Sequence, residues 1–352
     1  MGRAVNTWQE RLVLGQDYAS DKAMIAIEIS TYGSPDVLRP VERPKPTAAA
    51  GEVLIEVEAS GVSRADVFQR KGKYPPPAGA SDIPGLDVAG VIAAVGSGAG
   101  EWQVGDRVCA LLTGGGYAES CVAPAVQVLP IPEGWTAVEA ATLPENLFTV
   151  YDNLITRARL QEAETVLIHG GTSGIGSTAI MLARAIGAIP YATAGSDEKR
   201  RACEEIGAEQ AINYKTEDFV EAVQRITANR GVDVIADIVG GAYLERNIEA
   251  LALEGRLSLI ATLGGAVGTL PIGKLMSKRG TIVGSTMRAR TPAQKGEIAD
   301  RLRRHVWPLL PEKKTIRPLV DSTFPLAEAA MAHKRMESGD HIGKIVLMRE
   351  MS

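Results

Sequence analysis

A glycine-rich segment at residues 164–176 carries residue types that suit one kind of chemistry, the binding of a dinucleotide. It reads Glu-Thr-Val-Leu-Ile-His-Gly-Gly-Thr-Ser-Gly-Ile-Gly, so an apolar strand pattern runs directly into small residues that open a helix. Gly171 is expected to make the tight turn, and Gly176 to bring the helix close to the strand. Ser173 and Gly174 are expected to admit a phosphate to the backbone, where N–H groups at the helix start would face it. The pattern is imperfect, because Ser173 stands where the common G-x-G-x-x-G form has its middle glycine.

Alternating strand and helix patterns from residue 164 to about 287 would position this turn. Six segments fit strands: Val166–His169, Ile189–Thr193, Ala211–Asn213, Val232–Ile238, Arg256–Ala261 and Thr281–Gly284. The segments between the first five can hold helices, and the first of these helices is expected to end at Gly187. Six strands with intervening helices predict an α/β fold with a doubly wound, parallel Rossmann sheet.

Length and charge indicate a globular protein of two domains. A chain of 352 residues exceeds the size at which single cores usually stop growing, and its 45% hydrophobic content supplies material for two cores. A net charge of −4, with acidic and basic residues interspersed, predicts no nucleic-acid partner and no anionic membrane partner. No apolar run approaches the ~20 residues that a membrane-spanning helix needs.

The cysteines and the first residues bear on the compartment. Cys109, Cys121 and Cys203 are scattered and odd in number, which predicts neither a disulfide framework nor a C-x-x-C metal site and suits a reducing environment. Residues 1–23 lack the apolar stretch of a signal peptide, so the expected location is cytoplasmic. They precede the first convincing strand, Ile25–Ser30, and are interpreted as an N-terminal arm or as the result of an upstream start codon, with no function assigned.

The regions on either side of the nucleotide-binding pattern are predicted to form one further domain. Three strands, at 53–61, 88–95 and 107–112, and a short helix at 64–70 come before it, separated by Gly and Pro. Helices at 292–310 and 326–337 and a final strand at 343–349 follow it. Because that last segment is too short to form a core alone, we expect it to pack onto the N-terminal region. The predicted division is therefore a barrel-like domain of residues 24–147 and 288–352, with residues 148–287 as an inserted nucleotide domain.

The order and spacing of several short motifs from Met24 onward resemble a known family. These motifs are Gly51-Glu-Val-Leu-Ile-Glu-Val, Ser63-Arg-Ala-Asp, Gly72-Lys-Tyr-Pro-Pro-Pro, Pro84-Gly-Leu-Asp-Val-Ala-Gly, Val104-Gly-Asp-Arg-Val, Ala194-Gly-Ser, Asn213-Tyr and His341-Ile-Gly-Lys-Ile-Val. The chain resembles the medium-chain dehydrogenase/reductases, and among them the zinc-free quinone oxidoreductases, especially the group of the animal tumour-suppressor-induced enzyme and its bacterial relatives. The resemblance implies a GroES-like β-barrel substrate domain, a Rossmann domain, and NADPH in the cleft between them.

The departures from metal-dependent relatives predict a protein without zinc. Those relatives bind a catalytic zinc through a Cys near the Ser63 position and a His near the Leu86 position, and they carry four cysteines for a structural zinc. Serine and leucine cannot replace thiolate and imidazole in a tetrahedral site, and the four histidines show no ligand spacing. Without a Lewis acid, an acceptor that is already electrophilic, such as a quinone or a conjugated enone, is the expected substrate.

The end of the second strand bears on the choice between NADPH and NADH. An NAD site places Asp or Glu about 20 residues after the glycine turn, whereas this chain has Thr193-Ala-Gly-Ser there. Asp197 and Glu198 follow at once and argue the other way. The resemblance implies that Ser196, Lys199 and Tyr214 match positions that contact the 2′-phosphate in the relatives. Lys199 and Arg200 also fit a solvated helix face.

The predicted cofactor contacts combine the glycine turn with positions that the resemblance supplies. Thr149, expected at the start of the helix that enters the nucleotide domain, fits either a nicotinamide contact implied by the resemblance or an N-cap. The full set of predicted cofactor contacts is Thr149, Gly171, Ser173, Gly174, Ile175, Gly176, Ser196, Lys199, Tyr214 and Leu263.

Tyr74 and Ser63 are the predicted catalytic residues. Tyr74 precedes three prolines, a stiff segment that suits an aromatic ring at the cleft mouth, and it matches a pocket tyrosine in the relatives; a tyrosine packed on a turn is the alternative. The relatives usually have Asn where Ser63 stands. Asp66 fits the first turn of the helix at 64–70, where the macrodipole favours a carboxylate. His169 is interpreted as a packed core histidine rather than a catalytic base.

These observations predict an NADPH-dependent quinone reductase that transfers hydride directly, without metal, in an interdomain cleft. A reductase of α,β-unsaturated ketones or thioesters shares the same hydride step and is the alternative within enzymes. A nucleotide-binding structural protein or RNA-binding regulator is the alternative of another class. The resemblance also implies a homodimer through the last strand of the Rossmann sheet, near 281–285, whose edge would otherwise be exposed.

Overall fold

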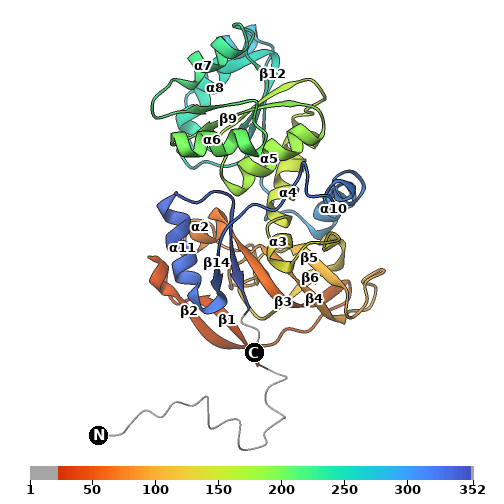
Figure 1. Ribbon diagram of the computed structural model, residues 1–352. Coiled ribbons are helices and arrows are strands. Elements are labelled where there is room, and N and C mark those ends of the chain that lie inside the picture. The colour runs from red at the N-terminus through yellow and green to blue at the C-terminus, as the bar shows by residue number, and fades with distance from the viewer. Residues whose placement is uncertain (1–22, 350–352) are drawn as a thin grey trace, which may run out of the picture.

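The computed structural model describes residues 23–349, which form two lobes joined by helices (Figure 1). The upper lobe in this view contains a six-stranded parallel sheet in the order β10-β9-β8-β11-β12-β13. Its strands are β8 (Thr165–Ile168), β9 (Ile189–Ala194), β10 (Gln210–Asn213), β11 (Val232–Asp237), β12 (Leu251–Leu259) and β13 (Thr281–Gly284). The doubly wound sheet is thus confirmed. Its order reverses between β8 and β11, the point at which ligands bind in such sheets.

Helices cover both faces of this sheet because its strands are apolar on both sides. Val166 and Ile168 of β8 join a core that includes Ala179 and Leu182, whereas Leu167 joins a separate core with Phe219. Alternate side chains of a strand point to opposite faces, so a near-continuous apolar run is buried by both layers. The helices of this lobe are α5 (Gly174–Ala185), α6 (Asp197–Ile206), α7 (Phe219–Ile226), α8 (Leu244–Ala250), α9 (Ile272–Ser277) and the short η4 (Gly241–Tyr243).

The lower lobe is organised around one long strand, β3. One edge of β3 pairs along its length with β4, while the other edge pairs first with β6 and then with β15. The final strand therefore packs onto the N-terminal region, as predicted. The strands of this lobe are β1 (Ala23–Ile29), β2 (Leu38–Pro44), β3 (Glu52–Val62), β4 (Asp87–Val95), β5 (Arg107–Leu111), β6 (Ser120–Pro124), β7 (Val128–Pro130), β14 (Val320–Pro325) and β15 (Lys344–Met348).

The remaining helical segments lie in the lower lobe and at the junction. They are η1 (Pro35–Val37), α2 (Arg64–Arg70), η2 (Ala125–Gln127), α3 (Ala137–Ala140), α4 (Pro144–Val150), the π-helical η3 (Tyr151–Arg157), α10 (Pro292–His305), η5 (Trp307–Leu309), η6 (Leu326–Glu328) and α11 (Ala329–Ser338). The predicted helix at 292–310 ends at His305 and is followed by the short η5, because Pro308 has no backbone N–H to continue the α-helical hydrogen bonds. The predicted arm lies outside the described residues apart from Ala23, which begins β1.

The connecting helix ties the two lobes together. It runs without a break from α4 into η3, so the predicted division after residue 147 falls inside a helical stretch. The Asn153 Oδ1 atom accepts hydrogen bonds from the hydroxyls of Ser258 in β12, at 3.1 Å, and Ser285 after β13, at 3.0 Å. One side chain of the segment that enters the upper lobe is thus bonded both to β12 and to the segment that leaves that lobe.

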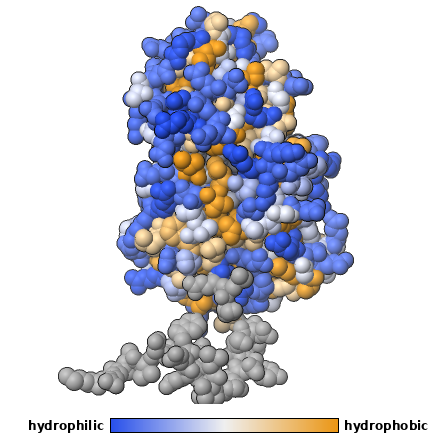
Figure 2. Space-filling model, in the orientation of Figure 1, coloured by the Kyte–Doolittle hydropathy of each residue, from blue (hydrophilic) through white to orange (hydrophobic). Residues whose placement is uncertain are grey.

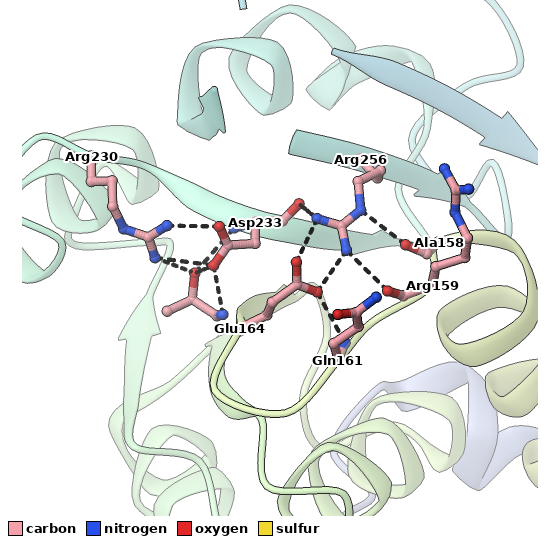
Figure 3. Close-up of polar contacts among 8 residues, drawn as sticks. Ala158, Arg159, Gln161, Glu164, Arg230, Asp233 and Arg256 are labelled. Carbon is pink, nitrogen blue, oxygen red and sulfur yellow. Dashed lines mark hydrogen bonds and ion pairs between the residues drawn. The ribbon is translucent and has the colours of Figure 1, made fainter. Parts of the chain in front are cut away.

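An ion-pair network fixes the amino ends of the central strands (Figure 3). Arg256 donates to Glu164 at 2.6 Å and also to backbone carbonyls at the end of the connecting helix. Arg230 pairs with Asp233 at 2.6 Å, and Asp233 accepts from the hydroxyl of Thr165 at 2.7 Å. This network lies at the end of the sheet opposite the cleft.

Among residues 23–349, no helix is both long and apolar enough to cross a bilayer.

Candidate functional site

A cavity of about 1060 Å³ lies between the two lobes. The upper lobe contributes residues at the carboxyl ends of its parallel strands, and the lower lobe contributes residues from α2, α4 and the segment before β15. Figure 2 shows apolar residues gathered where the lobes meet. The predicted residues that line the cavity are Ser63, Tyr74, Thr149, Ser173, Gly174, Ile175, Ser196, Lys199, Tyr214 and Leu263. Of the predicted set, Gly171 and Gly176 lie behind this surface.

The glycine turn joins β8 to α5, and Gly171 lies within it, as predicted, together with Gly170. Gly170 holds the left-handed backbone, with φ of 69°, and Gly171 packs against α6, where an added Cβ would lie 2.6 Å from Cys203 Sγ. The prediction for Gly176 agrees with the structure, because a Cβ there would lie 2.2 Å from the Gly170 carbonyl oxygen. No side chain larger than hydrogen fits between helix and turn.

The start of α5 presents backbone donors to the cavity. The Ser173 hydroxyl caps the helix by accepting from the Gly176 N–H at 2.9 Å. Gly174 and Ile175 precede any possible intrahelical acceptor, and both residues line the cavity. The positive end of the helix macrodipole adds to the attraction for an anion at this point.

The end of β9 places polar residues around the same cavity. The Ser196 hydroxyl caps α6 by accepting from the Lys199 N–H at 3.2 Å, and the Lys199 Nζ atom reaches across the cleft to the Gly339 carbonyl. Burial lowers the pKa of Lys199. A Cβ atom on Gly195 would lie 2.6 Å from the Tyr214 hydroxyl, so the absence of a side chain at Gly195 leaves room for Tyr214.

The charged neighbours of Lys199 point elsewhere. Asp197 accepts a hydrogen bond from the Asn213 side chain at 2.9 Å, and Arg200 pairs with Glu204 at 2.8 Å. Neither these two residues nor Glu198 are among the described residues that line the cavity. The two carboxylates that argue for NADH therefore do not face the space in which a ribose would lie.

Thr149 and Tyr74 line the part of the cavity nearer the lower lobe. Thr149 lies near the end of α4 inside a continuous helical stretch, so both its expected place at a helix start and its N-cap alternative are wrong. Its hydroxyl donates to Glu145 at 3.5 Å. Tyr74 is half-buried, with the Arg288 guanidinium carbon 5.4 Å from the ring centroid, and burial raises the pKa of its phenol.

Ser63 is held by Asp66 at the start of α2. Asp66 accepts from the Ser63 hydroxyl at 3.1 Å and from the Ser63 backbone N–H at 2.8 Å. It also accepts from the Gly85 N–H and the Tyr117 hydroxyl, and it is fully buried. The interpretation of Asp66 as a first-turn carboxylate is confirmed, and the Ser63 hydroxyl is a donor already in use.

The residues at the expected zinc positions do not fit a zinc ion. The Leu86 side chain has no atom that can bind a metal, and the Ser63 hydroxyl donates a hydrogen bond to Asp66. Among residues 23–349 no group of three or more His, Cys, Asp and Glu side chains could hold a metal. Tetrahedral zinc requires such a group of thiolate, imidazole or carboxylate ligands.

His169 is a core histidine. It is fully buried, with Nδ1 3.1 Å from the Thr193 hydroxyl and Nε2 2.7 Å from the Asn247 Oδ1 atom. Burial lowers the pKa of His169 to about 4, so the ring is neutral near pH 7. The sequence-based interpretation of this residue is confirmed.

Sequence reasoning missed a charged group on the floor of the cavity. Glu145 and Lys344 line the cavity, and Asp87 lies directly behind them. Asp87 and Lys344 stand inside two of the motifs that carry the family resemblance, in otherwise apolar strands. A charged residue in an apolar strand is a signal for a buried, paired group, since an unpaired buried charge is costly.

The inserted parallel sheet, the GroES-like barrel and the cleft between them define a medium-chain dehydrogenase/reductase. Residues 49–133 match the family model of the alcohol dehydrogenase GroES-like domain, and residues 174–303 match that of the zinc-binding dehydrogenases. The quinone oxidoreductase of Rattus norvegicus is 31% identical over 332 residues, which cover 93% of this chain and 98% of the rat protein. The chain therefore belongs to the quinone oxidoreductase family of this oxidoreductase superfamily.

Two solved structures extend the comparison. Escherichia coli quinone oxidoreductase in complex with NADPH has a TM-score of 0.79 and 28% identity, and the match covers 93% of this chain and 99% of that one. The CurK enoyl reductase has a TM-score of 0.81 and 29% identity, and the match covers 94% of this chain and 100% of that one.

Proposed function

We propose that this protein is an NADPH-dependent reductase that transfers hydride to a quinone without a metal ion. The observation that carries the proposal is a single cavity that joins an anion site to an aromatic acceptor site. The α5 amino end and Lys199 lie in its upper part, and Thr149 and Tyr74 line its lower part. Membership of the quinone oxidoreductase family and the NADPH complex of the E. coli enzyme support the same assignment.

The residues of the cavity fit a reduced dinucleotide. The α5 amino end suits the pyrophosphate, because Gly174 and Ile175 line the cavity there and have backbone N–H groups without intrahelical acceptors. Ser196, Lys199 and Tyr214 suit the 2′-phosphate that distinguishes NADPH from NADH, with Lys199 supplying the opposite charge. Thr149, Ile175 and Leu263 suit the nicotinamide half. When bound, NADPH supplies the hydride.

The chain's own contribution is orientation and exclusion of water. Tyr74 packs beside Arg288. The Arg288 guanidinium donates hydrogen bonds to the Tyr74 carbonyl oxygen at 3.2 Å and to the Gln69 Oε1 atom at 2.6 Å. This fixed aromatic ring suits a planar acceptor, and a quinone needs little activation because it is already electrophilic. Leu86 lies in the cavity wall where metal-dependent relatives have a ligand, so the acceptor meets an apolar wall there.

A reductase of conjugated enones or thioesters is the second candidate. The CurK enoyl reductase has the same fold at 29% identity, and the hydride step is common to both reactions. Oxidation of NADPH, measured by the loss of nicotinamide absorbance with a panel of quinones and enoyl thioesters, tests both candidates. Faster turnover with quinones supports the proposal, and fast enoyl reduction with negligible quinone reduction would replace it. An absence of oxidation with either class would favour a nucleotide-binding role without catalysis.

A homodimer through the edge of the upper sheet is part of the proposal. β13 lies at the end of the strand order, and apolar side chains nearby are exposed: Leu253, Leu263, Val267, Ile272 and Met276. An exposed strand edge beside such a patch is typical of a pairing surface. Sedimentation equilibrium would detect the dimer, and a monomer at micromolar concentration would contradict it.

A further inference from the structure

Three ionisable side chains from three elements meet on the floor of the cavity. The Lys344 Nζ atom lies 2.6 Å from an Asp87 oxygen and 3.8 Å from a Glu145 oxygen. The other Asp87 oxygen accepts from the Glu145 backbone N–H at 2.5 Å. Lys344 comes from β15, Asp87 from β4 and Glu145 from α4, so the group forms only when the chain has folded completely.

The group holds more negative than positive charge. One ammonium faces two carboxylates, and a third carboxylate, Asp66, lies close enough to act on Glu145. Asp87 is fully buried and takes the short contact with Lys344, whereas the Glu145 side chain is 19% exposed and opens to the cavity. Asp66 accepts hydrogen bonds from Ser63, Gly85 and Tyr117, which favour its ionised form, so we assign the proton that relieves the excess charge to Glu145. Burial raises the pKa of Glu145 to about 7, with Asp87 and Asp66 adding to the rise and Lys344 opposing it.

Glu145 also faces the proposed acceptor. Thr149 lies one helical turn further along α4, on the same face, and bonds to Glu145. Tyr74 lines the same cavity, and while burial is the main reason that its pKa is raised, the charge of Glu145 raises it further. The carboxyl group thus lies among the side chains assigned to the nicotinamide and to the quinone.

We propose that Glu145 is a catalytic acid, which gives the acceptor the proton that completes its reduction. The inference rests on the proposed reductase function and assigns the proton that the function leaves unassigned. The acceptor gains a hydride, one proton with two electrons, from the C–H bond of the reduced nicotinamide, and the quinone becomes a hydroquinone monoanion. The Glu145 O–H bond then breaks, its proton goes to the anionic oxygen, and the carboxylate keeps the electron pair.

The neighbouring groups stabilise and restore Glu145. The Lys344 ammonium stabilises the new carboxylate and Asp87 holds that ammonium, so these two are positioning residues. Glu145 regains a proton from water through the open side of the cavity. The Ser63 hydroxyl already donates to Asp66, whereas the Tyr74 phenol lines the cavity and is a competing donor.

The test compares Glu145→Gln with wild-type protein across pH. Glutamine keeps the size of the side chain but has no acidic proton. General acid catalysis contributes about 10²- to 10⁴-fold, so turnover at saturating NADPH and quinone should fall by that factor. Wild-type turnover should decline above about pH 7, as Glu145 loses its proton, and the variant should lose that decline. NADPH affinity, measured by fluorescence titration, should stay within about twofold in the variant. Glu297→Gln, an exposed carboxylate on α10, is the matched control and should behave as wild type.

A second variant keeps the proposal testable if glutamine disturbs the fold. Glu145→Ala should recover turnover when small carboxylic acids such as formic or acetic acid are added, because they can supply the missing proton. Unchanged turnover and pH profile in Glu145→Gln would overturn the proposal while leaving the reductase function intact. Loss of the pH profile in Tyr74→Phe instead would assign the proton to tyrosine and also overturn it. Wild-type protein that fails to oxidise NADPH with any acceptor would overturn both proposals.

Discussion

Replacing Lys199 with alanine is expected to weaken the binding of NADPH far more than that of NADH. The ammonium lies at the end of β9 in the cavity wall, where the 2′-phosphate of NADPH is proposed to bind. A charge-assisted hydrogen bond contributes about 1.5–3 kcal/mol, and every ~1.4 kcal/mol is tenfold in affinity. Lys199 is half-buried and must give up its bond to the Gly339 carbonyl, which costs about 1 kcal/mol of that gain. The net gain is therefore about 0.5–2 kcal/mol, and the expected increase in the NADPH dissociation constant is about twofold to thirtyfold.

The measurement is a fluorescence titration of each variant with NADPH and with NADH. Arg200→Ala is the matched control, because Arg200 is the next cation on α6 but pairs with Glu204 outside the cavity. It should leave both dissociation constants within about twofold of wild type. Equal losses for NADPH and NADH in Lys199→Ala would refute the assignment of the 2′-phosphate to this residue. An equal effect of Arg200→Ala would show that general charge, rather than position, sets the preference.

Three further predictions concern the acceptor, metal and acid stability. If ring packing orients the quinone, Tyr74→Phe should keep most activity while Tyr74→Ala raises the quinone KM; a hydroxyl role would make both changes similarly damaging. Purified protein should contain less than one zinc per chain, and chelators should leave turnover unchanged; stoichiometric zinc with chelator-sensitive activity would contradict this. Burial lowers the pKa of His169 and His341 to about 4 and of His333 to about 3, from 6.5. Below pH 6.5 the unfolded chain takes up protons on these histidines that the folded chain does not. Each histidine should therefore lower the free energy of unfolding by up to about 1.4 kcal/mol for each pH unit below 6.5. Glu145 opposes this change, because its raised pKa makes the folded chain take up a proton near pH 7 before the unfolded chain does. Urea unfolding at about pH 7 and about pH 5.5 measures the net change, and a higher stability at about pH 5.5 would refute the prediction.

The upper sheet could be predicted from the sequence to within a few residues at most strand ends. Its strands are buried on both faces and read as short apolar runs between glycine-rich turns. β2, β6, β7 and β14 were not predicted, because short strands at the edge of a barrel lack such runs, and β2 contains Pro40 and Pro44. The choice between Gly170 and Gly171 at the turn depends on backbone angles that two adjacent glycines do not distinguish.

Most of the predicted residues in the upper-lobe wall of the cavity do line it, because they follow the carboxyl ends of β8 and β9, which the sequence pattern locates. Glu145 could not be predicted, because its properties come from residues far away in the sequence. Lys344 lies about 200 residues later and Asp87 about 60 residues earlier, and only the folded barrel brings their side chains within reach. Local sequence patterns do not predict which distant residues come into contact. A lysine in an apolar strand does indicate that it has a buried partner, but not which residue that partner is.

The place of β15 in the barrel has a consequence for the order of events during synthesis. Half of one edge of β3 pairs with β15, so that edge stays open until residues 344–348 leave the ribosome. The inserted upper lobe is complete much earlier and can fold by local contacts, while closure of the lower lobe waits for a pairing across nearly the whole chain. Pairings of such high sequence separation form slowly and leave unpaired strands exposed meanwhile. Truncation of the last ten residues should therefore harm refolding of the lower lobe first, and an unfinished chain would present its β3 edge to chaperones.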